Sequence, residues 1–118
     1  MPNKGRPSPI ELLKDEFAQE KASALGRLGR ALEAALAALA SFDAEESHEA
    51  PAAGRRELRA ALVAEASVAL WHFVVQREAC GLRDLRYVLR DYRVPAEVAA
   101  RMGALSEAPR GPRRAQRR

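Results

Sequence analysis

Apolar residues recur at helical spacing through most of the chain, and prolines and glycines interrupt the pattern at a few points. The first such segment runs from about residue 9 to 42 without an internal proline, and Ser8-Pro9-Ile10-Glu11 has the pattern of a capping box at its start. A helix of this extent would be about 50 Å long at 1.5 Å per residue. The spacing therefore predicts one long amphipathic helix. Its recurring apolar positions are Ile10, Leu13, Phe17, Ala24, Leu28, Leu32, Ala35, Leu39 and Phe42.

Three further helices are predicted after an acidic segment, residues 43–54, that reads as a loop because Pro51 and Gly54 close it. They cover about 55–80, ending at Gly81, then about 82–92, ending before Pro95, and a short helix over 95–102 that stops at Gly103. No segment alternates like a strand, and aromatic residues make up only 5% of the chain. The predicted fold class is all-α: a long antiparallel helical hairpin with two short C-terminal helices packed across its open end.

The chain has 118 residues, which suffices for one small domain. We expect a flexible N-terminal lead over 1–7, a single helical domain over 8–105 and a disordered, arginine-rich tail over 106–118. A compact chain of this size has a radius of gyration of about 13 to 14 Å, so it cannot surround a 50 Å helix on all sides. An uncovered flank predicts a homodimer.

Folding the hairpin about residues 43–54 places residues opposite each other when their numbers add to about 97. Glu20 then lies opposite Arg77, with Gln76 and Glu78 nearby, which predicts a polar network at one end of the hairpin. Two interpretations are open: an ion pair that fixes the register, or a polar recognition site. The same register packs Trp71 against two helix glycines, which are Gly26 and Gly29.

The net charge of +4 is concentrated at the two ends, and residues 8–105 are mildly acidic. Four arginines of the third predicted helix span about 80° of its surface. Such a stripe can bind phosphates, and the basic tail would add attraction to nucleic acid or to another anionic partner. The alternative is a solvated face in which Asp84 and Asp91 pair locally with the arginines. The candidate contacts are Arg83, Arg86, Arg90 and Arg93 in the helix and Arg113, Arg114, Arg117 and Arg118 in the tail.

Catalytic and metal-binding patterns are not recognisable in the sequence. His72 and Cys80 are two turns apart, and Glu45-x-x-His48 falls in the predicted loop, so neither supplies a full ligand set. There is no phosphate-binding glycine loop, nucleophile elbow or dinucleotide fingerprint. We therefore predict no enzymatic activity, no metal and no cofactor. Cys80, near the predicted C-terminus of a helix, is expected to be buried and inert.

The sequence also favours a cytoplasmic location. A single cysteine fits a reducing compartment, the N-terminus lacks the apolar stretch of a secretory signal, and no apolar run reaches the length of a membrane span. We expect a soluble protein without a membrane-spanning segment.

Two blocks carry a resemblance to a known family: QEKASALGRLG at residues 19–29 and VQREACGLRD at residues 75–84. With them the chain resembles an uncharacterised family of small alphaproteobacterial proteins, a domain of unknown function, over roughly residues 10–103. The resemblance implies a similar helical fold and transfers no site residue. The leading hypothesis is a non-enzymatic interaction or structural module that self-associates and has a further protein partner. The alternative is a nucleic-acid-binding protein that uses the arginines.

Overall fold

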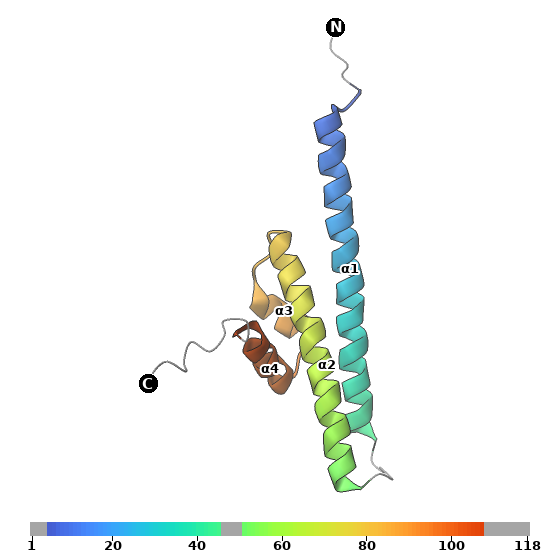
Figure 1. Cartoon of the computed structure of the whole chain (residues 1–118), viewed down its shortest axis with the longest axis vertical. Helices are drawn as coiled ribbons and strands as arrows, with labels where there is room; N and C mark the ends of the chain where they lie inside the picture. The colour runs from blue at the N-terminus through green and yellow to red at the C-terminus, as the bar shows by residue number, and fades with distance from the viewer. Residues whose placement is uncertain (1–4, 46–50, 108–118) are drawn as a thin grey trace, which may run out of the picture.

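The computed structural model describes residues 5–45 and 51–107, of which residues 106 and 107 are described by their backbone alone. Within these ranges the chain forms four α-helices, α1 (Pro9–Ala44), α2 (Ala52–Ala79), α3 (Leu85–Asp91) and α4 (Ala96–Glu107). Figure 1 shows α1 and α2 running antiparallel as a hairpin, with α3 and α4 beside α2. The predicted all-α hairpin is confirmed. The short helices pack along the flank of α2, however, and do not close over the open end of the hairpin.

The predicted start of α1 is confirmed by a complete capping box. The Ser8 hydroxyl accepts a hydrogen bond from the Glu11 amide at 3.1 Å, and the Ser8 amide donates to the Glu11 carboxylate at 3.1 Å. These two bonds satisfy amide groups that have no partner inside the helix. The helix thus has a fixed first turn although its surroundings are solvent.

The end of α2 also has the predicted form. Cys80 caps the helix and Gly81 follows with a φ of 86°, the left-handed conformation that favours glycine. The Gly81 amide donates to the Glu78 carbonyl at 3.0 Å and the Leu82 amide to the Arg77 carbonyl at 2.8 Å. This pair of bonds is a Schellman motif, which turns the chain away from α1 towards α3.

The remaining helix boundaries differ from the predictions. Helix α2 begins at Ala52, so Gly54 lies in its first turn and not in a loop. Helix α4 continues through Gly103 to Glu107, because a glycine inside a helix costs only about 1 kcal/mol and does not by itself end it. The first two residues of the predicted tail therefore belong to α4, while 1–4 and 108–118 lie outside the described residues.

Helix α3 is shorter than predicted, and it ends on a residue with an uncommon backbone conformation. Arg93 has a φ of 52°, and its amide donates to the Arg90 carbonyl at 3.2 Å. The Val94 amide donates to the Leu89 carbonyl at 2.9 Å, so Arg93 occupies the position that glycine fills after α2. An L-residue with a Cβ atom is strained there by about 1 kcal/mol.

Replacing Arg93 with glycine is expected to raise the free energy of unfolding by about 1 kcal/mol, because glycine adopts this conformation without the strain. Urea denaturation followed by circular dichroism measures the change. Arg90→Gly, inside α3, is the matched control and should lower the same free energy by about 1 kcal/mol. A loss of stability in Arg93→Gly would show that the arginine side chain contributes more than its backbone costs.

The core lies where α1, α2 and α4 meet, and α3 closes one side through Val88. At its centre Phe73 and Tyr92 pack edge to face, with ring centroids 5.2 Å apart. A Cβ atom at Gly29 would lie 3.1 Å from the Tyr92 hydroxyl and 3.2 Å from the Phe73 ring, so these rings, and not the predicted Trp71, fill the space beside this glycine. The buried apolar residues are Leu32, Leu39, Val63, Ala66, Leu70, Phe73, Val88, Val98 and Met102.

The hairpin register is shifted by about five residues from the prediction in this region. Gly29 faces Phe73, and Asp43 pairs with Arg59, so opposed residue numbers add to 102. The shift arises because the first turns of α2 extend past the end of α1 (Figure 1). A register counted from the loop alone assumes that both helices end level with each other, which they do not.

Candidate interaction surface on the first helix

Most of the N-terminal part of α1, residues 9–23, extends past the end of α2 (Figure 1). Each of these residues is exposed, and the segment extends for about 22 Å at 1.5 Å per residue. Figure 1 shows it projecting beyond the end of α2. The radius of gyration is 20.0 Å, well above the roughly 13 to 14 Å of a compact chain of this length. We call residues 9–23 the free half of α1.

An apolar row follows one side of α1 at intervals of seven residues, from the free half to the last turns. We call it the outer row: Ile10, Phe17, Ala24, Ala31 and Ala38. Ile10 and Phe17 are 64% and 63% exposed. Ala31 and Ala38 are also exposed, and Ala24 is half-buried. Residues seven apart differ by only about 20° around a straight helix, so the five side chains share a face.

Helix α2 covers a neighbouring face of α1 and leaves the outer row uncovered. Leu32 and Leu39 are buried against α2 and the core. Each directly follows a residue of the outer row, and successive residues of a helix are about 100° apart. The uncovered row is therefore a second apolar face of α1, distinct from the one used to fold the hairpin.

Charged residues of opposite sign flank the outer row in the free half. Lys14 and Lys21 lie about 40 to 60° to one side of Phe17, and Glu20 and Glu16 lie about 60 to 100° to the other side. All four are exposed. Within the residues that the structure describes, no ion pair joins any of them to another residue. The two flanks of the outer row therefore carry charges of opposite sign that form no ion pairs within the described residues.

A shallow groove of about 540 Å³ lies where the free half diverges from the end of α2. The Gln76 side-chain amide of α2 donates to the carbonyl of Lys21, one of the groove residues, at 3.5 Å. Cys80 reaches this groove and is half-buried, so the prediction of a buried thiol is wrong in part. The groove is lined by Lys14, Phe17, Ala18, Lys21, Ala22, Leu25, Ala79 and Cys80.

The predicted polar network does not form as one unit. Gln76 reaches α1, but the Arg77 guanidinium lies over the rings of Phe73 and Tyr87, 5.9 and 5.6 Å from their centroids. Glu20 and Glu78 are exposed, and no ion pair joins Glu20 to Arg77 within the described residues. The aromatic pair, which comes from α2 and α3, attracts the guanidinium through cation–π contacts that the hairpin pattern alone does not reveal.

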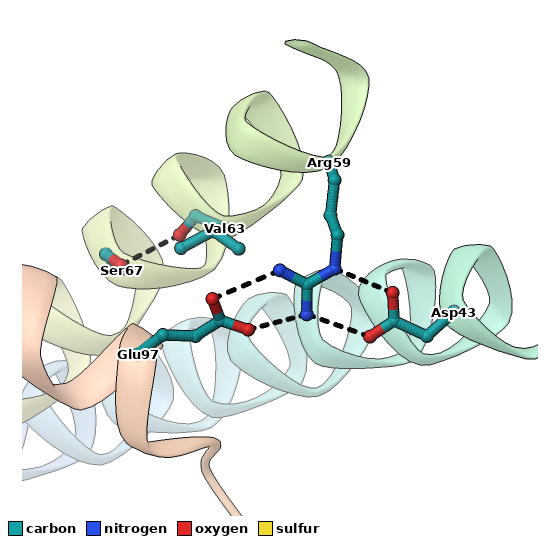
Figure 2. A network of polar contacts seen from close by, with 5 residues as sticks. All are labelled: Asp43, Arg59, Val63, Ser67 and Glu97. Atoms are coloured by element: carbon teal, nitrogen blue, oxygen red, sulfur yellow. Dashed lines mark hydrogen bonds and ion pairs between the residues drawn. The ribbon is translucent and has the colours of Figure 1, made fainter. Parts of the chain in front are cut away.

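The strongest polar cluster of the described chain was not predicted. The Arg59 guanidinium donates to both Asp43 oxygens, at 2.8 and 3.0 Å, and also to both oxygens of Glu97 (Figure 2). It thereby joins α1, α2 and α4. Both carboxylates raise the pKa of Arg59, Asp43 most, and the hydrogen bonds from Arg59 lower the pKa of Glu97.

Close to this cluster, Ser67 connects α2 to α4. Its hydroxyl is buried between the Val63 and Val98 carbonyls, 2.8 and 3.2 Å away. Ser67 and Val63 are drawn beside Arg59 in Figure 2. The Arg59 cluster and Ser67 hold α4 against α2. No sequence motif near Arg59, Asp43 or Glu97 indicates that these three residues meet. We interpret both as structural.

The four predicted arginines of the third helix do not share one helix. Only Arg86 and Arg90 belong to α3; Arg83 precedes its N-cap, Asp84, and Arg93 follows its C-cap. All four are exposed. The predicted 80° stripe is therefore wrong, because it assumed helical geometry beyond both ends of α3. The predicted tail contacts lie outside the described residues, and nucleic-acid binding stays a prediction.

The comparison with protein families decides the classification. Residues 3–110 match DUF6665, a family of unknown function. The chain belongs to this family. The prediction of a domain of unknown function, made from residues 19–29 and 75–84, is thus confirmed. Neither the curated proteins nor the solved structures contain a match to the chain.

Two further findings bear on the chemistry of this DUF6665 protein. Among the described residues, no three or more His, Cys, Asp or Glu side chains come together in a metal-binding arrangement. His72 is exposed and lies against Trp71, with ring centroids 5.6 Å apart, while His48 lies outside the described ranges. Within the described ranges the structure thus adds no metal-ligand cluster to the candidates considered from the sequence.

One helix is long and apolar enough to cross a membrane by length and composition. It is α2, Ala52–Ala79, in contrast to the expectation that no apolar run has this length. The core helix of a soluble protein passes the same test; α2 packs against both α1 and α4, and 28% of its apolar window is buried. The absence of a membrane span stays a prediction.

Proposed function

We propose that this protein is a non-enzymatic interaction module that assembles with a second copy of itself through the outer row of α1. The observation that carries the proposal is the exposure of Ile10, Leu13 and Phe17 on one face of a helix segment in which every residue is exposed. Transferring a large apolar side chain from water into a contact gains about 1.5 to 3 kcal/mol. Burial of these side chains in a contact therefore favours association of the free half, which is already helical.

The mixed charges of this face favour a second copy over a strongly acidic or strongly basic partner. The free half carries both signs of charge, Lys14 and Lys21 on one flank and Glu16 and Glu20 on the other, so a helix of the same pattern supplies complementary charges. Helices pair through a heptad repeat with apolar residues at positions a and d. The outer row supplies the a positions, and Leu13 and Ala34 supply apolar d positions, whereas Glu20 and Arg27 are charged d positions. The ordering cost is small because the capping box fixes the helix before it meets its partner.

We also propose a cytoplasmic, soluble setting for this assembly. One free cysteine, half-buried at the end of α2, fits a reducing compartment. Val63, Leu70 and Phe73 of α2 are buried in the core, whereas Leu58, Val68 and Val75 are exposed, and the Ser67 hydroxyl in the middle of α2 donates to the Val98 carbonyl of α4. These features support a core helix.

Two adjacent leucines offer a sharp test of the self-association. Leu13 lies beside the outer row and Leu12 about 140° from Phe17, on the opposite side of the helix. Both are 51% exposed, so neither substitution disturbs the core. We expect the wild type to form dimers in sedimentation equilibrium, Leu13→Glu to weaken the dimer about a hundredfold, and Leu12→Glu to leave it within about twofold.

Circular dichroism of both variants serves as the control for helix content, which should equal that of the wild type. A monomeric wild type at all accessible concentrations would overturn the proposal. Equal weakening by Leu12→Glu and Leu13→Glu would show that the dimer uses a different face of α1.

A further inference from the structure

We propose that the two copies pair with their α1 helices parallel and in register, so that Glu16 of each copy faces Lys21 of the other. This orientation rests on the proposed self-association and specifies its geometry. In a heptad repeat labelled a to g, the outer row occupies the a positions. Glu16 is then at position g, and Lys21 is at position e of the next heptad. In a parallel pair, g of one helix lies beside the next e of the other.

The charges on the two flanks distinguish parallel from antiparallel pairing. A parallel pair brings the flank with Glu16 against the flank with Lys21, twice by symmetry. An antiparallel pair brings each flank against the same flank of the second copy, so lysines meet lysines and glutamates meet glutamates. All of these side chains are exposed and have no ion-pair partner within the described residues, so they are free to pair in this way.

The length of the outer row favours the same orientation. The row continues from the free half to Ala31 and Ala38, which are exposed beside the α1–α2 contact. In a parallel pair in register, each row residue meets its equivalent from Ile10 to Ala38. The small side chains of Ala31 and Ala38 allow the two α1 helices to approach closely along the part of α1 that packs against α2. An antiparallel pair through the free halves leaves Ala31 and Ala38 uncovered.

The parallel register also places two acidic groups together. Glu20 occupies position d, between the Phe17 and Ala24 layers, and meets Glu20 of the second copy, and Arg27 at the next d position likewise meets Arg27. A carboxylate at this position weakens the pair and limits it to a moderate affinity. It also gives a position where a cysteine can report the orientation without removing an apolar contact.

Charge reversal tests the predicted contact between Glu16 and Lys21. In a parallel dimer, Glu16→Lys alone and Lys21→Glu alone each create two like-charge contacts, and each should weaken the dimer about tenfold in sedimentation equilibrium at low salt. The double variant Glu16→Lys, Lys21→Glu restores opposite charges and should return to within about threefold of the wild type. An antiparallel dimer has like charges on each flank before and after any of these changes, so the single variants would leave its affinity unchanged.

Disulfide formation gives an independent readout of the orientation. In a Cys80→Ser background, Glu20→Cys should form a covalent dimer under mild oxidation, because parallel register brings the two residues side by side. Leu12→Cys, on the opposite side of the helix, is the matched control and should stay largely uncrosslinked.

The outcomes separate the orientation from the self-association itself. A dimer that is weakened by Leu13→Glu but is unaffected by the single charge reversals, with no Glu20→Cys crosslink, overturns the parallel arrangement alone. A monomeric wild type overturns both proposals. Weakening by each single reversal, recovery in the double variant and the Glu20→Cys crosslink together establish the parallel pair.

Discussion

Replacing Gly29 with leucine is expected to lower the free energy of unfolding by about 3 kcal/mol. The α-carbon of Gly29 is buried against the Phe73 ring and the Tyr92 hydroxyl, and an added Cβ atom would lie 3.2 and 3.1 Å from them. Phe73 is buried and packs edge to face on Tyr92, so a leucine at position 29 requires this ring pair to shift. Overpacking of this kind costs about 1 to 3 kcal/mol, and leucine adds three further carbon atoms.

Gly26→Leu is the matched control, in the same helix and one turn away. A Cβ atom there meets only the end of the flexible Arg30 side chain, at 3.4 Å. Leucine favours the helix over glycine, so this variant should gain about 0.5 to 1 kcal/mol. Guanidinium denaturation at one fixed protein concentration measures both variants. Equal stabilisation at both positions would mean that the Phe73–Tyr92 contact yields easily and does not require a glycine.

Truncating Leu70 to alanine is expected to cost about 3 kcal/mol. Leu70 has no exposed surface and lies in the small core shared by α1, α2 and α4. Removal of a buried leucine side chain loses its transfer free energy and leaves a cavity, which together cost about 2 to 5 kcal/mol. A domain of this size has a total stability of about 5 to 15 kcal/mol, so the variant should melt many degrees below the wild type.

Val68 provides the comparison on the same helix. It is 40% exposed, so Val68→Ala should change the free energy of unfolding by no more than about 0.5 kcal/mol. Thermal unfolding followed at 222 nm distinguishes the two. If Leu70→Ala were no more destabilising than Val68→Ala, the core would not lie where the structure places it.

The Gly29 variants and the variants of the free half test different parts of α1. Gly29 and Leu32 belong to the face that folds the hairpin, and a change there alters the stability of each chain. Ile10, Leu13 and Phe17 belong to the free half, where a change alters assembly and leaves the fold intact. Variants of the outer row that reduced the stability of the monomer would contradict this division.

Local sequence signals determined the helices and several of their ends. The capping box at Ser8 and Glu11 and the left-handed glycine at position 81 depend on residues within one turn, so they can be predicted without knowing the fold. The uncovered length of α1 also follows from the sequence, because a chain of this size cannot surround so long a helix. The homodimer predicted from that length stays a proposal, with its face now assigned to the outer row.

Only the tertiary structure decided which residues meet across helices. The offset between α1 and α2 shifted the register, so Gly29 meets Phe73 and Tyr92, and Arg77 lies over aromatic rings. Arg59 pairs with Asp43, 16 positions away, and with Glu97, 38 positions away. Such pairings depend on where whole helices sit. A helical pattern gives the face of each residue along its own axis, but it contains no information on how far one helix slides past the next.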